Sequence, residues 1–189
     1  MPTPMQRLEP AATAVVVVDV QEKLAAAMPA PQMEALTRAA TLLIEAARRL
    51  GAPVLATEQY PAGLGPTVRP IADRLAQAGA PVLSKMEFSA CDAAEFERAW
   101  AKLAPRAAIV VGMEAHVCVY QTARDLAARG VLVHVPLDGV ASRRDDHRLA
   151  GLDLCRAAGA TLTTAETVVF DWLRVAGTDD FKHLARLIR

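Results

Sequence analysis

The sequence is poor in aromatic residues and has no excess of charge of either sign. Aromatic residues make up only 4% of the 189 residues and hydrophobic residues 53%. The core must therefore be built from Ala, Val and Leu, which suits close packing of helices on a sheet and excludes a disordered chain. The 21 Lys and Arg balance the 21 Asp and Glu. Because nucleic acids and anionic membranes attract clustered positive charge, we expect neither as a partner.

Long apolar runs are also missing. The longest, around Ala14 to Val18 and Ala107 to Met113, are far shorter than the roughly 18 residues that span a bilayer. The first ten residues, MPTPMQRLEP, do not resemble a secretory signal, because no charged region precedes an apolar stretch there. We therefore expect a cytoplasmic protein, and the length favours one domain over residues 1–189.

The cysteine and histidine patterns of common cross-links and metal sites are absent. Cys91, Cys118 and Cys155 form an odd set without a CxxC pair, which argues against a disulfide framework and a zinc site. The histidines show no HxH or HxxxH spacing, no GxGxxG follows the first predicted strand, and no GxxxxGK[ST] occurs. The sequence thus predicts no metal and no cofactor. The four histidines are His116, His134, His147 and His183.

Short apolar runs recur along the chain and alternate with helical patterns. The runs are apolar at nearly every residue, which is typical of strands covered on both faces. Strict alternation of strand and helix predicts a parallel sheet between two layers of helices, a three-layer Rossmann-like α/β fold. The predicted strands are Ala14–Asp19, Pro53–Thr57, Pro81–Ser84, Ala107–Gly112, Val131–Pro136 and, more weakly, Ala160–Thr163.

Helix ends are predicted from local signals. The apolar face from Met33 to Leu50 predicts a helix that ends at Gly51. Asp92 and Glu95 resemble a capping box that opens the helix Ala93 to Leu103. A later helix is predicted to start near Val117 and to end at Gly130. Ser142 with Asp145 precedes another helix, which is predicted to end near Gly159. We interpret the charged run 143–148 as the solvated start of the last of these helices.

Three reactive side chains follow predicted strands at their carboxyl ends, where ligands bind in open α/β sheets. Asp19 ends the first strand, Lys85 ends the third, and Cys118 opens the helix after the fourth. With the strand order 3-2-1-4-5-6, Asp19 and Cys118 would lie on either side of the crevice. A helix N-terminus and a nearby ammonium both favour a thiolate, and a carboxylate can exchange its proton during acyl transfer. The residues alone leave open an inert buried Cys, a turn Asp and a solvated Lys.

Three segments resemble the isochorismatase-like cysteine hydrolase superfamily: AVVVVDVQEKL (14–24), VLSKMEFSAC (82–91) and VVGMEAHVCVYQTARDL (110–126). The resemblance extends over essentially the whole chain and implies a six-stranded parallel sheet. It also implies that Asp19, Lys85 and Cys118 form a catalytic triad. A cis peptide is implied between Met113 and Glu114, aiming the backbone N–H groups of Glu114 and Cys118 at an oxyanion.

Departures from the family narrow the implied activity. Nicotinamidases of the superfamily carry metal-binding histidines after the second strand, whereas the chain has Thr57-Glu58-Gln59-Tyr60 there. True isochorismatases lack the nucleophilic Cys. The sequence is most similar to the isochorismatase domain-containing or YcaC-like subgroup, which implies a homo-oligomer, from a dimer to an octamer.

We therefore expect a metal-independent hydrolase of a small amide or related C–N compound that acts through a thioester. One alternative is hydrolysis of an isochorismate-type vinyl ether with Asp19 as the acid. Another is a redox-responsive thiol or scaffold protein without turnover. The residues expected to line the substrate pocket are Gln21, Gln59, Tyr60, Phe88 and Ala115.

Overall fold

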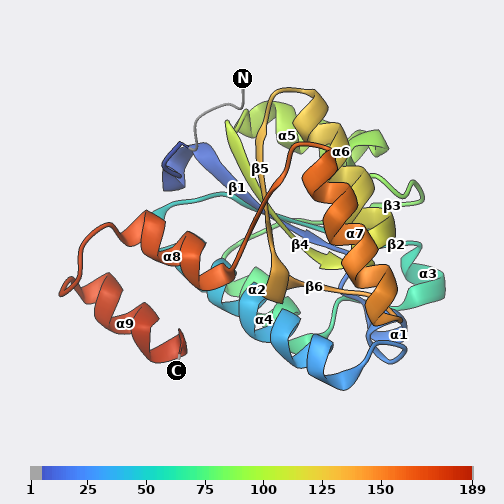
Figure 1. The fold of residues 1–189 in the computed structure, drawn as a ribbon, viewed down its shortest axis with the longest axis horizontal. Helices are drawn as coiled ribbons and strands as arrows, with labels where there is room; N and C mark the ends of the chain where they lie inside the picture. Colours follow the sequence, from blue (N-terminus) through green and yellow to red (C-terminus); the bar gives the residue numbers. More distant parts are fainter. Residues whose placement is uncertain (1–5, 189) are drawn as a thin grey trace.

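A computed structural model describes residues 6–188, so the first half of the segment MPTPMQRLEP, which was expected not to be a secretory signal, lies outside the described residues. Its centre is a seven-stranded parallel sheet in the order β3-β2-β1-β4-β5-β7, with the two-residue strand β6 pairing with β4 (Figure 1). This confirms the predicted three-layer α/β fold and strand order, the predicted sixth strand being β7. The strands are β1 (Thr13–Val18), β2 (Val54–Gln59), β3 (Val82–Lys85), β4 (Ala107–Met113), β5 (Leu132–Pro136), β6 (Val140–Ala141) and β7 (Thr161–Thr163).

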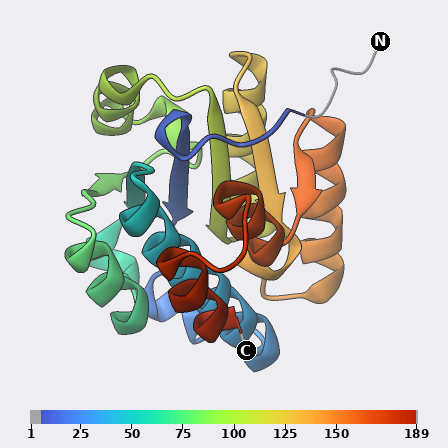
Figure 2. The same cartoon turned by 90° about the vertical axis from the view of Figure 1, so that its left-hand side faces the viewer.

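Helices cover both faces of the sheet. One face packs against α2, α4, α8 and α9, and the other against α5, α6 and α7. Figure 2 shows α8 and α9 on the same side as α2. The helices are α1 (Glu22–Ala25), α2 (Ala30–Leu50), α3 (Pro61–Leu64), α4 (Arg69–Gln77), α5 (Ala94–Leu103), α6 (Tyr120–Ala128), α7 (Asp145–Ala157), α8 (Ala165–Leu173) and α9 (Asp179–Ile188).

The two central strands are the most deeply buried. Every residue of β1 and of β4 is buried, as the continuous apolar runs predict. Their registers pair Val18 with Gly112, so both strands end at the same level of the sheet. Because the chain leaves β1 toward β2 on one side and β4 toward β5 on the other, their carboxyl ends form the topological switch point, where ligands bind in open α/β sheets.

Two of the predicted capping signals are wrong. The N-cap of α5 is Ala93, without a side-chain hydrogen bond, and Ser89 instead accepts from Cys91 N ahead of it. Similarly, α7 begins after Arg144, while the Ser142 hydroxyl contacts the chain around Ala115. A short polar side chain near a helix start serves tertiary contacts as readily as a cap, so the local pattern is ambiguous.

No helix among residues 6–188 is both long and apolar enough to cross a membrane.

Candidate active site

Asp19 lies directly beyond β1 and is fully buried. Its backbone has φ of +53°, a left-handed conformation that Asp tolerates better than most residues and that is common at functional sites. One carboxylate oxygen accepts a hydrogen bond from Thr57 Oγ1 at 2.7 Å, and the other binds Lys85 Nζ at 2.7 Å. The carboxylate therefore holds one fixed orientation.

Lys85, the last residue of β3, reaches two strands across the sheet to Asp19. Its ammonium also lies 2.7 Å from Gln59 Oε1, and 3.0 and 3.1 Å from the carbonyl oxygens of Glu87 and Phe88. An ammonium has three hydrogens, so these four acceptors use its donor capacity completely. Lys85 is thus a buried, immobilised positive charge beside Asp19, and the long reach that the sequence required is present.

Cys118 lies in a five-residue π-helix, Ala115–Val119, rather than at the start of α6. The segment follows β4 through a cis peptide between Met113 and Glu114, at the position that the resemblance implies. The carbonyl of Glu114 accepts from the N–H groups of Val117 and Val119. π-Helical turns are rare and frequent at functional sites, and one here carries the thiol.

The thiol of Cys118 does not have the depressed pKa that we expected. Burial, followed by the charge of Asp19, raises its pKa to about 12, although Lys85 acts in the opposite direction. A hydrogen bond with the Asp19 side chain contributes in the same direction as burial. Cys118 therefore rests as a thiol, and the neighbouring carboxylate is the group placed to accept its proton.

Glu114 and Arg143 form an ion pair beside this loop. The Arg143 guanidinium lies 3.1–3.2 Å from both Glu114 carboxylate oxygens, and Arg143 N donates to Oε2 at 3.1 Å. Burial opposes ionisation of Glu114, but these hydrogen bonds and the Arg143 charge hold its pKa below the usual value. Arg143 is solvent-exposed, as the interpretation of residues 143–148 requires, but it lies before α7 and pairs with Glu114, which the sequence did not indicate.

The predicted pocket residues divide into two groups. Gln21 is fully buried, and its amide bonds the backbone of Gln59 and the carbonyl of Gly65, so it holds the loop after β2. Ala115 is also buried, and its N–H donates to Ser142 Oγ. In contrast, the side chains of Tyr60 and Phe88 are about half exposed. The side chain of Gln59 links Lys85 to the carbonyl of Met86.

Two side chains of this site were missed in the sequence. Thr57 orients Asp19, and Ser142 holds the loop that carries Cys118. Thr57 pairs with Val18 near the carboxyl end of β2, at the same sheet edge as Asp19, and this position is the signal that could have identified it. Ser142 follows β6, a strand of two residues without a periodicity of its own, so no sequence signal identifies Ser142.

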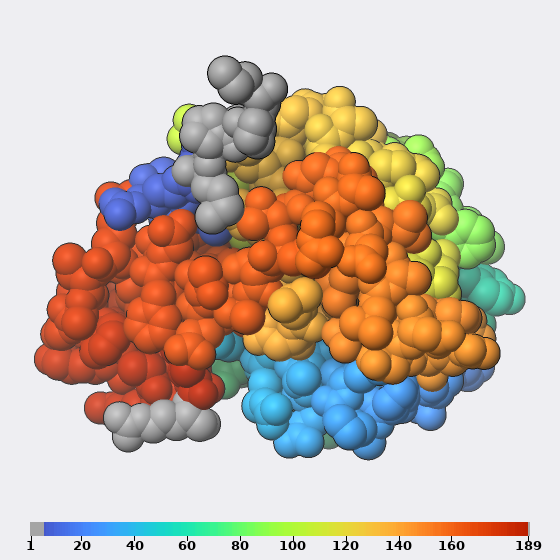
Figure 3. All heavy atoms as spheres, in the orientation of Figure 1, coloured from blue at the N-terminus to red at the C-terminus, as the bar shows by residue number. Residues whose placement is uncertain are grey.

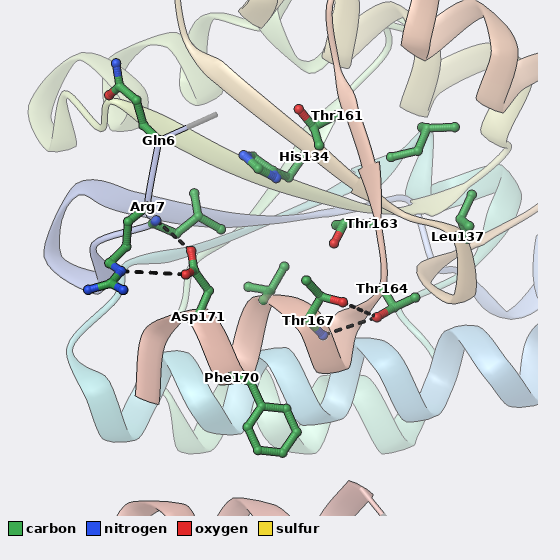
Figure 4. A pocket seen from close by; sticks show the side chains of 13 residues that line it. Gln6, Arg7, His134, Leu137, Thr161, Thr163, Thr164, Thr167, Phe170 and Asp171 are labelled. Carbon is green, nitrogen blue, oxygen red and sulfur yellow. Dashed lines mark hydrogen bonds and ion pairs between the residues drawn. The ribbon is translucent and has the colours of Figure 1, made fainter. Parts of the chain in front are cut away.

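The structure also contains hollows away from this cluster. A cavity of about 800 Å³ lies between β5, β7, α8 and the N-terminal segment, lined by residues such as His134, Thr163 and Asp171 (Figure 4). None of the predicted site residues lines it. A smaller hollow of about 320 Å³ lies beside Lys85, Met86 and Glu87. Within residues 6–188, no group of three or more His, Cys, Asp or Glu side chains is arranged to hold a metal ion.

Comparison with known proteins shows related folds and sequences. In solved structures, the chain matches the MAR1 ribonuclease from Caenorhabditis elegans with a TM-score of 0.88 and 38% identity, over 97% of this chain and 92% of that one. The octameric YcaC hydrolase of unknown specificity from Escherichia coli matches with a TM-score of 0.89 and 24% identity, over 98% and 91% of the chains. The latter likeness concerns the fold alone.

Sequence comparison identifies the family. Isochorismatase domain-containing protein 2 from Bos taurus is 34% identical over 183 residues, which are 97% of this chain and 86% of that protein. Residues 13–167 match the isochorismatase domain, a span that includes Asp19, Lys85 and Cys118. The chain therefore belongs to the isochorismatase family of hydrolases.

Proposed function

We propose that the protein is a metal-independent cysteine hydrolase that cleaves a small amide or related C–N compound. Cys118 is the nucleophile, Asp19 the general base and then acid, and Lys85 the charge that holds Asp19 in place. The observation that carries the proposal is the buried contact of Asp19 with Lys85 at 2.7 Å beside a thiol whose pKa responds to both. We place no metal or other cofactor in the reaction.

The reaction follows from the protonation states. As Cys118 Sγ attacks the substrate carbonyl carbon, the Asp19 carboxylate takes the thiol proton and the carbonyl π electrons move to oxygen. Backbone N–H groups of Glu114 and Cys118 stabilise this oxyanion. When the oxyanion collapses, the C–N bond breaks and Asp19 returns the proton to the leaving nitrogen. Asp19 then activates water, which cleaves the thioester and restores the thiol and the carboxylate.

Ammonia release from a panel of small amides, ureas and carbamoyl compounds tests this proposal. We expect release by the wild type, loss of release in Cys118→Ala, and retention in Cys155→Ala, a matched control that removes another buried thiol. Activity on isochorismate that survives Cys118→Ala would favour vinyl ether hydrolysis instead. Reversible oxidation of Cys118 by peroxide, with no turnover of any compound, would favour a redox-responsive protein.

A second candidate, RNA hydrolysis, rests on one observation. A structure 38% identical to this chain is described as a ribonuclease, although the balanced charge of the chain argues against a nucleic acid partner. Incubation with end-labelled single-stranded RNA distinguishes the two functions. The amide proposal predicts intact RNA, while cleavage that is lost in Cys118→Ala would establish the second candidate.

We include a homo-oligomer in the proposal. The exposed side chains of Tyr60, Met86 and Phe88 lie just beyond the ends of β2 and β3, near the site. Apolar side chains gathered in this way are typical of association surfaces. Light scattering coupled to size-exclusion chromatography measures the oligomeric state, and we expect a dimer or a larger assembly. A monomer at micromolar concentration would contradict the proposed homo-oligomer.

A further inference from the structure

We infer that Ser142 and Gly151 position the oxyanion loop, residues 114–118, from outside the reacting centre. This inference rests on the proposed function, because the loop carries the nucleophile and both proposed oxyanion donors. The segment 142–151 joins β6 to the first turns of α7 and lies against the π-helix. It supplies a hydrogen bond, an ion pair and a close backbone contact to the same few residues.

The hydrogen bond comes from the buried hydroxyl of Ser142. Ser142 Oγ accepts from Ala115 N at 3.1 Å and lies 3.1 Å from His116 Nδ1. Ser142 itself is fixed on two sides. Its N–H donates to Gln32 Oε1 of α2, and the preceding strand β6 pairs with the end of β4. Figure 3 shows α2 and α7 meeting at the surface on the face in view.

This bond determines which N–H groups remain for an oxyanion. The Ala115 N–H is committed to Ser142, and those of Val117 and Val119 are committed to the Glu114 carbonyl. The N–H groups next to the proposed donors Glu114 and Cys118 therefore already have acceptors and are not free to bind an oxyanion. Without the Ser142 hydroxyl, a buried Ala115 N–H would lose its acceptor and the loop would rotate to recover one.

The close contact comes from Gly151 in α7. A Cβ at this position would lie 2.5 Å from Ala115 C and 2.6 Å from His116 N, which are backbone atoms that cannot move independently of the loop. Only glycine lets α7 approach the Ala115–His116 peptide this closely. Gly151 is therefore a steric stop that defines the position of the loop, as Ser142 defines its orientation.

The surroundings of His116 favour its neutral form and so fix the direction of its hydrogen bond with Ser142. His116 faces the His147 ring at 4.6 Å between centroids, and Glu114, Arg143 and Asp146 also act on its charge. Burial, against the opposing pull of Glu114, leaves the pKa of His116 below its usual value. A neutral His116 accepts the Ser142 hydroxyl hydrogen at Nδ1, and Ser142 then remains free to accept from Ala115.

Two reactions of Cys118 separate positioning from simple folding. Acylation by p-nitrophenyl acetate builds negative charge on an oxygen and requires the oxyanion donors. Alkylation by iodoacetamide displaces iodide from carbon, with sulfur gaining the C–S bond, and builds no oxyanion. We expect Ser142→Ala and Gly151→Ala each to slow acylation roughly ten- to a hundredfold, while alkylation changes less than about twofold.

Matched variants complete the experiment. Ser142→Thr keeps the hydroxyl and is expected to recover most of the acylation rate. Arg156→Gln removes an exposed ion pair with Asp153 elsewhere on α7 and is expected to leave both rates unchanged. Hydrogen exchange of the Ala115 amide provides a readout that needs no turnover, and Ser142→Ala is expected to accelerate it.

The outcomes separate this inference from the proposed function. Wild-type acylation of Cys118, slowed selectively in Ser142→Ala, supports both. Equal acylation by wild type and Ser142→Ala overturns the inference and leaves the proposed function standing, as does an equal slowing of acylation and alkylation. If p-nitrophenyl acetate does not acylate Cys118 in the wild type, the proposed function and the catalytic role of the loop are both overturned. Unchanged Ala115 exchange overturns the positioning itself.

Discussion

Cys118 is a thiol held next to a carboxylate, and this pairing has a measurable pH dependence. Because its pKa is raised to about 12, the thiolate fraction rises about tenfold per pH unit between pH 8 and 11. A thiol with an ordinary pKa near 9 would level off within this range. We expect the alkylation rate of Cys118 by iodoacetamide, followed by peptide mass spectrometry, to keep rising through pH 10. A plateau near pH 8 would indicate a thiolate at rest.

Replacing the carboxylate should separate reactivity from turnover. In Asp19→Asn the negative charge that raises the pKa of Cys118 is removed, so alkylation at pH 8 is expected to become several-fold faster. Hydrolysis should fall by at least about a hundredfold, because the proton acceptor is gone. Parallel measurement of both rates checks this, and slower alkylation together with slower hydrolysis would contradict the arrangement.

Lys85 and Asp19 are both buried, so removing one partner leaves an uncompensated charge. We expect Lys85→Met to lower the free energy of unfolding by about 3–5 kcal/mol. The double variant Lys85→Met, Asp19→Asn is expected to recover much of this loss, because no buried charge remains. Urea denaturation of the wild type, both single variants and the double variant measures the effect. A Lys85→Met variant that loses less than about 1 kcal/mol, or a double variant whose loss is the sum of the two single losses, would show weak coupling.

At the scale of elements, the close approach of β1 and β4 depends on Gly112. Its φ is +134°, and a Cβ there would lie 2.0 Å from the Val18 carbonyl oxygen. We expect Gly112→Ala to destabilise the protein by about 3 kcal/mol and to displace the end of β1 next to Asp19. Gly130→Ala is the control, because its φ is also positive but its surroundings are open, and about 1 kcal/mol is expected. Equal losses in thermal unfolding would show that backbone conformation alone matters.

The elements also show which parts of the fold the sequence can predict. Strands β1 and β4 were predictable because continuous apolar runs report burial on both faces. The two-residue strand β6 and the π-helix were not, since neither has a periodicity of its own. Ser142 resembles a cap until its partner, 27 residues earlier in the chain, is known. The role of such a residue depends on contacts between elements that are distant in sequence, which a local pattern does not report.

The candidate site divides in the same way. Asp19, Lys85 and Cys118 were named because they follow strands and match a family signature, and both depend on sequence alone. The acceptors around Lys85 and the raised pKa of Cys118 depend on burial, which a motif does not report. The expectation of a thiolate failed for this reason: the favourable field of Lys85 is smaller than the effects of burial and of Asp19.

At the scale of the whole molecule, buried thiols make stability depend on alkaline pH. Burial raises the pKa of Cys155 from 9.0 to about 12. The folded state therefore keeps a proton that the unfolded state loses above pH 9. Each such thiol lowers the free energy of unfolding by about 1.4 kcal/mol per pH unit between these values. This stability is complete below pH 9 and declines as the pH rises.

Cys155→Ala isolates one thiol. We expect its free energy of unfolding to decline less steeply than that of the wild type between pH 9 and 11, by about 1.4 kcal/mol per pH unit. Urea unfolding at several pH values provides the two slopes. Identical slopes would mean that Cys155 titrates alike in both states.

Trapping of the acyl-enzyme intermediate tests directly whether Cys118 is the nucleophile. Wild type, Cys118→Ala and Cys155→Ala are mixed with p-nitrophenyl acetate, quenched in acid and examined by intact-mass and peptide mass spectrometry. We expect one acetyl group on Cys118 in the wild type and in Cys155→Ala, and none in Cys118→Ala. An acetyl group that persists in Cys118→Ala, or that maps to Cys91 or Cys155 in the wild type, would contradict this expectation.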